Sequence, residues 1–239
     1  MVSKTVDQNV LNSASPKHWV GLIIMHLLIP LVLIICGWDL GWWQGWLYSA
    51  LIVVAGIGPR MWVEKKRPGL MAERGKFGKA QNVKSWDKVL APLMAVSISF
   101  PLVIVAGLDH HFGWSPVFPT WLNILGFILI VLGYTFAGWA FTENRFFSTV
   151  VRIQTDRGHM VCDSGPYQIV RHPGYLAGIL FAISIPLLIG SGFAFIAVGI
   201  YVILMLLRTW LEDKTLQEEL EGYSEYVSQV RYRLFPGIW

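Results

Sequence analysis

Six long apolar stretches constrain the fold of this 239-residue chain more than any other feature. They cover residues 19–36, 42–58, 89–108, 121–141, 175–189 and 193–207. The first four have about the length that crosses roughly 30 Å of hydrocarbon, whereas the last two are shorter. Apolar residues make up 54% of the chain and charged residues only 14%, against about 25% charged in a soluble domain. The pattern predicts an all-α, polytopic membrane protein.

The basic residues between the stretches predict the topology. All 19 Lys and Arg residues lie before the first stretch or after the second, fourth and sixth, and the other three connections contain none. The positive-inside rule then predicts six transmembrane helices with both termini in the cytoplasm. The same rule explains the net charge of +4 without nucleic-acid binding. It also places Cys36 and Cys162 on opposite sides of the membrane, where they cannot pair.

These features divide the chain into three regions. The regions are a polar N-terminal leader at 1–18, four transmembrane helices at 19–142, and a C-terminal region at 143–239 that holds the last two stretches. A basic cytoplasmic loop at 59–88 lies inside the second region, after Pro59, which we expect to end the second helix. We interpret this loop as a topology signal; binding of anionic headgroups is the alternative.

Two expectations concern the shape of the C-terminal region. Gly190, Ser191 and Gly192 separate the last two apolar stretches, and such a flexible break favours a short helical hairpin over a single kinked helix. From Glu212 onward, apolar residues recur at helical spacing among acidic ones, which predicts a separate cytoplasmic C-terminal helix.

A polar cluster precedes the hairpin, in the segment 159–175, HMVCDSGPYQIVRHPGY. Pro173 suits the first turn of a helix, which places His172 at the helix N-terminus. His172 could serve only as a cap, but Tyr167, Arg171 and Tyr175 stand in the same short segment. The cluster therefore predicts one wall of a cofactor site, and we expect the C-terminal tail to form the other wall.

Arg208 and Glu212 follow the last apolar stretch at a spacing of four residues. A surface ion pair of this kind contributes only a few tenths of a kcal/mol, but an ionisable residue at the hydrocarbon boundary is a functional candidate. A hairpin would return both residues beside His172 and Tyr175. The chain contains no Walker loop, GxGxxG, HExxH or CxxC motif, which disfavours nucleotide, hydrolase and metal sites.

Three segments carry a resemblance to a known family. GPYQIVRHPGY, RTWLE and EGYSEYVSQVRYRLFPGIW resemble the C-terminal half of the isoprenylcysteine carboxyl methyltransferase family, over roughly residues 143–239. The related phospholipid methyltransferases share this outline, and PGLMAERGK and KSWDKVL resemble loops of bacterial members. The resemblance implies an integral membrane enzyme that uses S-adenosylmethionine, without a metal, to methylate a lipophilic acceptor from the bilayer.

The resemblance also implies roles for particular residues. Arg208 would face the acceptor as the catalytic residue. The cofactor contacts would be Arg152, His159, Met160, Val161, Cys162, Tyr167, His172, Pro173, Gly174, Tyr175 and Glu212. At the position of Arg152 the eukaryotic members carry an amide side chain, so the role of this residue stays open.

Methyl transfer from a sulfonium is a direct displacement, which needs aligned reactants more than acid–base help. If the acceptor is a carboxylate, Arg208 can bind it in a bidentate manner and no base is needed. An amine or thiol acceptor would require a base, for which His172 and Glu212 are candidates. The alternatives are an NADPH-dependent enzyme resembling sterol reductases, which have longer chains, and a non-enzymatic membrane scaffold. The acceptor and the oligomeric state stay open.

Overall fold

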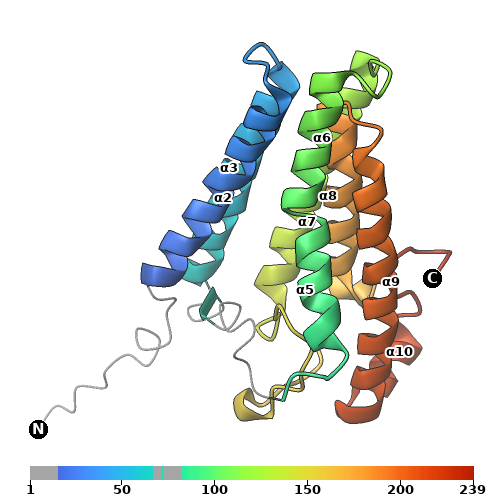
Figure 1. The fold of residues 1–239 in the computed structure, drawn as a ribbon. Helices are drawn as coiled ribbons and strands as arrows, with labels where there is room; N and C mark the ends of the chain where they lie inside the picture. The colour runs from blue at the N-terminus through green and yellow to red at the C-terminus, as the bar shows by residue number, and fades with distance from the viewer. Residues whose placement is uncertain (1–15, 67–70, 73–81) are drawn as a thin grey trace, which may run out of the picture.

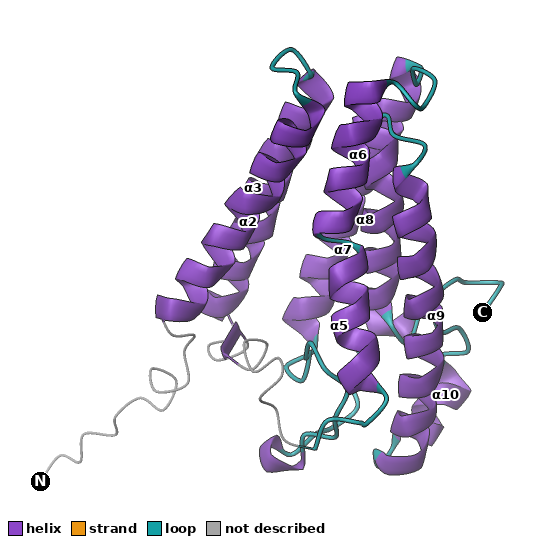
Figure 2. Cartoon of the chain, viewed as in Figure 1, coloured by secondary structure: helices purple, strands orange, loops and turns teal. Residues whose placement is uncertain are grey.

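The computed structural model describes residues 16–66, 71–72 and 82–239, and over these residues it contains helices and loops but no strand (Figure 1, Figure 2). The main helices are α2 (Pro16–Gly37), α3 (Trp43–Lys66), α5 (Asp87–Ser97), α6 (Phe100–Phe112), α7 (Thr120–Glu143), α8 (Pro173–Ile189), α9 (Ala194–Glu219) and α10 (Tyr223–Gln229). The predicted all-α fold is confirmed for the described chain.

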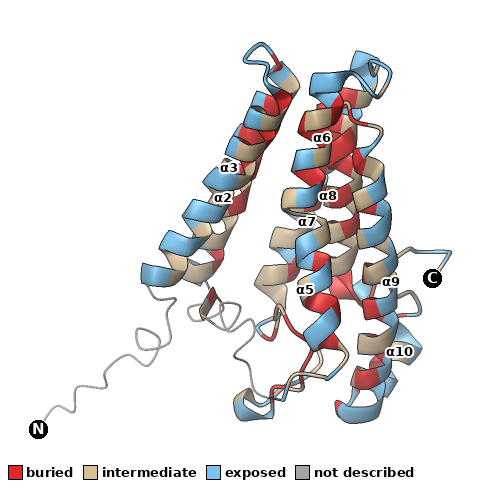
Figure 3. Cartoon of the chain, viewed as in Figure 1, coloured by how far each residue is buried: buried red, intermediate tan, exposed pale blue. Residues whose placement is uncertain are grey.

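Within the residues that the structure describes, five helical segments are long and apolar enough to cross a membrane. They are α2, α3, α5 together with α6, α7 and α9, whereas α8 is shorter, with 17 residues. Large apolar side chains are exposed along the outer faces of these helices, where the burial colouring shows pale blue (Figure 3). Such continuous apolar exposure suits contact with lipid. The chain is an integral membrane protein, and a sixth crossing by α8 stays a prediction.

We expected the second helix to end at Pro59, but it does not. Helix α3 continues through this proline to Lys66, so Arg60 lies inside the helix and not in the following loop. Here the guanidinium of Arg60 donates to the carbonyl of Gly56, and its Nη1 lies 3.4 Å from Nε2 of His26 on α2.

The third stretch was predicted as one helix, but it forms two. Helix α5 ends at Ser97, and α6 begins at Phe100 with Pro101 in its first turn. A proline lacks the backbone N–H that would continue the ladder, and it disfavours the helical conformation in the residue before it. The two helices follow one another along the same side of the bundle (Figure 1).

The hairpin of the last two stretches is confirmed, but its second arm is longer than predicted. Helix α8 ends at Gly190, which has a φ of +76°, and α9 begins at Ala194 and runs alongside α8 (Figure 1). No separate helix begins at Glu212. Helix α9 continues to Glu219, and two of its charged residues, Arg208 and Asp213, are buried against charged partners. The chain then turns at Gly222, with a φ of +80°, into the short helix α10.

Helices α7 and α8 approach each other closely at Gly126. A Cβ atom placed there would lie 2.4 Å from the backbone nitrogen of Leu188 and 2.8 Å from the carbonyl oxygen of Ser184. The surrounding apolar core joins α2, α3, α6, α7, α8 and α9, with Ile130 and Ile185 among its buried members. Only glycine allows this contact between the two backbones.

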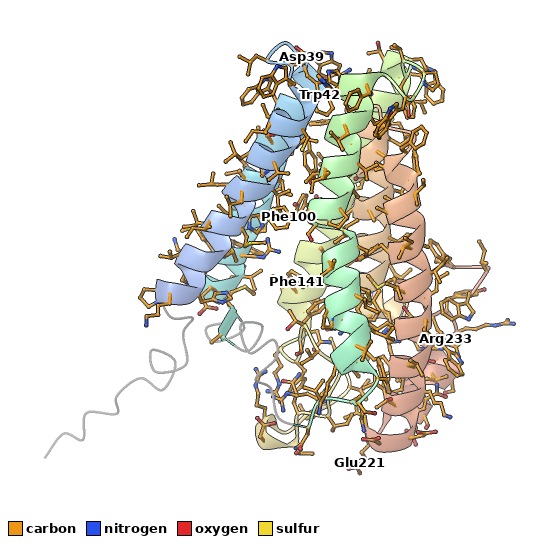
Figure 4. All side chains as sticks on the ribbon, in the orientation of Figure 1. Asp39, Trp42, Phe100, Phe141, Glu221 and Arg233 are labelled. Carbon is orange, nitrogen blue, oxygen red and sulfur yellow. The ribbon has the colours of Figure 1, made fainter. Side chains whose placement is uncertain are left out.

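The turns at one end of the molecule are joined by a buried carboxylate. Asp109 on α6 accepts hydrogen bonds from the backbone N–H and the hydroxyl of Ser115, both at 2.7 Å, and from the hydroxyl of Ser191 at 2.5 Å. It thereby ties α6 to the turn between α8 and α9. Asp39 and Trp42, in the turn between α2 and α3, lie at this same end, and Glu221 lies at the opposite end (Figure 4).

The leader and the basic loop lie largely outside the described residues. Residues 1–15, 67–70 and 73–81 are not described, while Pro16 to His18 already belong to α2. The first part of the predicted loop, up to Lys66, is helical. Met71 is buried against Val63, and its backbone N–H donates to Glu64.

Candidate active site

A cavity lies where the 144–175 segment meets the end of α9 and the helix α10. It contains about 750 Å³ of space not filled by protein atoms, its open mouth included. Apart from Pro173, every predicted cofactor contact is among its lining residues. Arg208 is not among them. The geometry thus brings the predicted cofactor residues together but leaves their roles to be tested.

Sequence reasoning missed a second group of lining residues. This group comprises Asn144, Phe146, Phe147, Gln154, Leu216, Leu220, Tyr223 and Tyr226. The tyrosines stand in α10, which belongs to the C-terminal tail that was expected to form the other wall, but no role was predicted for either tyrosine in the cavity. Two one-turn 3-10 helices, Thr155–Arg157 and Gly165–Gln168, shape that segment.

His172 is the residue just before α8, and Pro173 occupies the first turn, as predicted. The imidazole makes no capping bond to the helix. Instead it stacks on the ring of Tyr175, with the centroids 5.6 Å apart, and its Nε2 lies 3.2 Å from Oδ1 of Asp213. An ionised carboxylate can only accept, so Nε2 carries a proton. The backbone N–H of His172 donates to the carbonyl of Arg233, which attaches the C-terminal tail to this wall.

Asp213 holds together several segments around the cavity, although no sequence pattern identified it as a site residue. Its carboxylate is fully buried. The donors are Arg171 (2.8 and 2.9 Å), His172 (3.2 Å), Gln217 (2.9 Å), Tyr223 (3.1 Å) and Arg233 (2.8 Å). A buried charge is tolerated when it is paired and fully hydrogen-bonded in this way. The network joins the start of α8, the end of α9, α10 and the tail.

Glu212 and Tyr175 form the contact that the hairpin predicted. The phenol of Tyr175 donates to the carboxylate of Glu212, and both line the cavity. The guanidinium carbon of Arg208 lies 5.4 Å from the centre of the Tyr175 ring. The expected convergence of these residues with His172 is therefore confirmed.

Arg208 is buried, and its bidentate partner is a side chain of this protein. Its Nε donates to Oδ1 of Asp87 at 2.7 Å, and its Nη2 donates to Oδ2 of Asp87 at 3.1 Å. Nη2 also donates to the carbonyl of Thr149 at 2.8 Å. The side of the guanidinium that was expected to bind an acceptor carboxylate is thus occupied by Asp87, and an acceptor would have to use the remaining Nη1.

His159 is held neutral on the opposite wall. Burial, reinforced by the positive charges of Arg152 and Arg157, lowers the pKa of His159 to about 4. Its Nδ1 accepts from the backbone N–H of Gln154 at 3.2 Å, so in the neutral ring Nε2 carries the hydrogen. The ring packs on Phe146, with the centroids 4.7 Å apart. Arg152, also buried, donates to Asp156 at 2.8 Å.

Tyr167 closes the cavity between the predicted turn and α10. Its hydroxyl accepts from Asn144 at 3.2 Å, and its carbonyl accepts from the hydroxyl of Tyr226 at 2.6 Å. Burial raises the pKa of Tyr167 well above its ordinary value, so the phenol stays protonated. Gly165 makes the turn possible, since its φ is +57° and a Cβ would lie 2.6 Å from the side chain of Glu143.

The segment that forms most of this site matches a described family. The model of the isoprenylcysteine carboxyl methyltransferase (ICMT) family matches residues 124–218. The similarity to the ICMT family is therefore carried by this segment, about two fifths of the chain. The match covers α7, the loop with its cavity residues, α8 and nearly all of α9, but neither α10 nor the tail.

Two relatives support this assignment at low identity. The chain is 26% identical over 102 residues to protein-S-isoprenylcysteine O-methyltransferase B of Arabidopsis thaliana, and this match covers 42% of the chain and 48% of the relative. It is 23% identical over 146 residues to a probable protein-S-isoprenylcysteine O-methyltransferase of Oryza sativa subsp. indica, covering 59% and 68%. The chain thus matches about half of the Arabidopsis protein. Both relatives come from plants, so the bacterial resemblance stays an expectation.

Proposed function

We propose that this protein is an S-adenosylmethionine-dependent methyltransferase that esterifies the carboxylate of a lipophilic acceptor, an isoprenylcysteine or a similar amphiphile taken from the bilayer. The observation that carries the proposal is the cavity at the start of α8 and the end of α9. Its lining lies largely within the family segment and includes the predicted cofactor residues. The names of the relatives favour a prenylated cysteine as the acceptor.

The residues present fit the proposed cofactor. Glu212 supplies a carboxylate on the cavity wall for a cationic or hydroxyl-bearing group, and it is held in place by Tyr175. The aromatic side chains of Phe146 and Tyr223 offer flat apolar surface for a heterocycle. The neutral His159 can exchange hydrogen bonds without adding positive charge near a sulfonium. When bound, S-adenosylmethionine supplies an electrophilic methyl group.

The chain's own part in the reaction is to bind, orient and exclude water. A carboxylate acceptor is already ionised at neutral pH and needs no base. Arg208 provides a fixed positive charge close to Tyr175 and Glu212, which suits orientation of an anionic oxygen. Displacement of water strengthens these interactions and aligns the reactants. We further propose that the site and both termini face the cytoplasm, as the distribution of basic residues predicts.

Isothermal titration of the purified, detergent-solubilised protein tests the cofactor. S-adenosylhomocysteine should bind, NADPH should not, and Glu212→Gln should weaken binding of the first ligand by about tenfold or more, the effect of losing a charge-assisted hydrogen bond. Glu218→Gln is the matched control, because Glu218 is an exposed carboxylate on the same helix, 3.8 Å from Lys214. Binding of NADPH alone would reject the methyltransferase proposal in favour of a reductase, and binding of neither ligand would reject it outright.

A further inference from the structure

Asp87 stands at the start of α5, outside the segment that matches the family, yet its side chain reaches the candidate site. The carboxylate is fully buried. Besides the two bonds from Arg208, its Oδ2 accepts from the backbone N–H of Val151 at 2.6 Å. Val151 and the following Arg152 line the cavity. One carboxylate therefore holds both the arginine of α9 and a wall of the cavity.

The same contacts leave one donor of Arg208 uncommitted. Nε and Nη2 are engaged by Asp87 and by the carbonyl of Thr149, whereas Nη1 has no hydrogen bond to any residue that the structure describes. The arginine is buried and packs over Tyr175, whose phenol reaches Glu212 at the cavity. A buried N–H without an acceptor is costly, which suits a group that gains its partner when an acceptor binds.

We propose that Asp87 is a positioning residue for methyl transfer, which fixes Arg208 so that Nη1 is presented to the acceptor carboxylate. The physical reason is that an arginine side chain has many rotamers, and a bidentate carboxylate selects one of them before the acceptor arrives. Asp87 also compensates the positive charge of Arg208, which would otherwise be buried without a counter-ion. This inference rests on the proposed function and adds to it a residue from the unmatched half of the chain.

The test is Asp87→Asn in the full-length protein, assayed with S-adenosylmethionine and an S-prenylated N-acetylcysteine. We expect kcat/KM for the acceptor to fall on the order of 10²-fold, the usual effect of a misplaced orienting group. The affinity for S-adenosylhomocysteine should change by less than about threefold, because Asp87 does not touch the cavity directly. In an Arg208→Lys background the same substitution should change kcat/KM by less than about threefold, since both residues act as one unit.

Two further variants keep the result interpretable. Asp109→Asn removes a carboxylate that is equally buried but lies in the turns at the opposite end of the molecule, so it should lower the thermal midpoint while leaving kcat/KM unchanged. Asp87→Glu keeps the charge, and it should retain the fold while losing activity less severely than Asp87→Asn.

If the wild-type protein is active, any one of three outcomes would overturn the inference. These are unchanged kcat/KM in Asp87→Asn, an equal loss in the Arg208→Lys background, or an equal loss in Asp109→Asn. Failure of the proposed function looks different, because the wild-type protein would then transfer no methyl group, and the positioning role would be rejected with it.

Discussion

Asp213 accepts hydrogen bonds from five side chains that belong to the start of α8, to α9, to α10 and to the tail. Asp213→Asn removes the charge that compensates Arg171 and Arg233. We expect a loss of about 3–5 kcal/mol in the free energy of unfolding, as for other buried ion pairs that lose one partner. Thermal unfolding in detergent measures this loss. Glu225→Gln, on an exposed position of α10, is the control, and an equal midpoint in both variants would contradict the network's importance.

The neutral state of His159 predicts a pH dependence. In the folded protein its pKa is about 4, below the ordinary 6.5. A depressed pKa means that the unfolded chain binds the proton more tightly than the folded protein does. The contribution of neutral His159 to the free energy of unfolding is therefore complete above pH 6.5 and is lost as the pH falls towards 4. His159→Gln cannot titrate. The thermal midpoint of the wild type should therefore fall more steeply than that of the variant across this window, and parallel curves would refute the assignment.

The residues of the site differ in how visible they were in the sequence. His172, Tyr175 and Glu212 could be placed together because a helical hairpin returns its two ends to the same level. Asp87 and Asp213 could not be selected by this route. Asp87 pairs with a residue 121 positions away in the chain. Asp213 follows Glu212 in a run of charged residues, and only its buried hydrogen bonds distinguish it from its acidic neighbours.

At the scale of helices, the contact between α7 and α8 gives a direct prediction. Gly126→Ala would place a methyl group 2.4 Å from the backbone of Leu188. Overpacking of this kind costs about 1–3 kcal/mol. Gly21→Ala in α2 is the matched control, because nothing lies within 4 Å of the added methyl there. Gly126→Ala should lower the thermal midpoint and Gly21→Ala should not, whereas equal effects would show that the helices can separate freely.

The order of the apolar helices followed from hydropathy, but the division of the third stretch into α5 and α6 and several helix ends did not. Pro59 was expected to end the second helix, yet α3 continues through it to Lys66. The residues from Glu212 onward were expected to form a separate helix, yet they extend α9 to Glu219, and Asp213 among them has buried partners. Helix ends depend on such tertiary contacts, which a local pattern does not contain.

At the scale of the whole molecule, the topology can be tested without any assay of activity. Leu40 and Glu221 are exposed, and Asp39, the neighbour of Leu40, lies at the opposite end of the molecule from Glu221 (Figure 4). In a background without Cys36 and Cys162, Leu40→Cys should react with a membrane-impermeant thiol reagent in intact cells, and Glu221→Cys only after permeabilisation. The control is a single-cysteine variant at Glu225, on the side of Glu221. Labelling of both ends from outside would reject the six-span arrangement with a cytoplasmic site.

The central claim is methyl transfer to a lipophilic carboxylate. The most direct measurement supplies methyl-labelled S-adenosylmethionine and an S-prenylated N-acetylcysteine to the protein in lipid nanodiscs and collects the label released by base, since methyl esters are base-labile and methylated amines or thioethers are not. We expect base-labile label with the wild type and none when the acceptor carboxylate is replaced by an amide. Base-stable label, or no transfer at all, would contradict the proposed reaction.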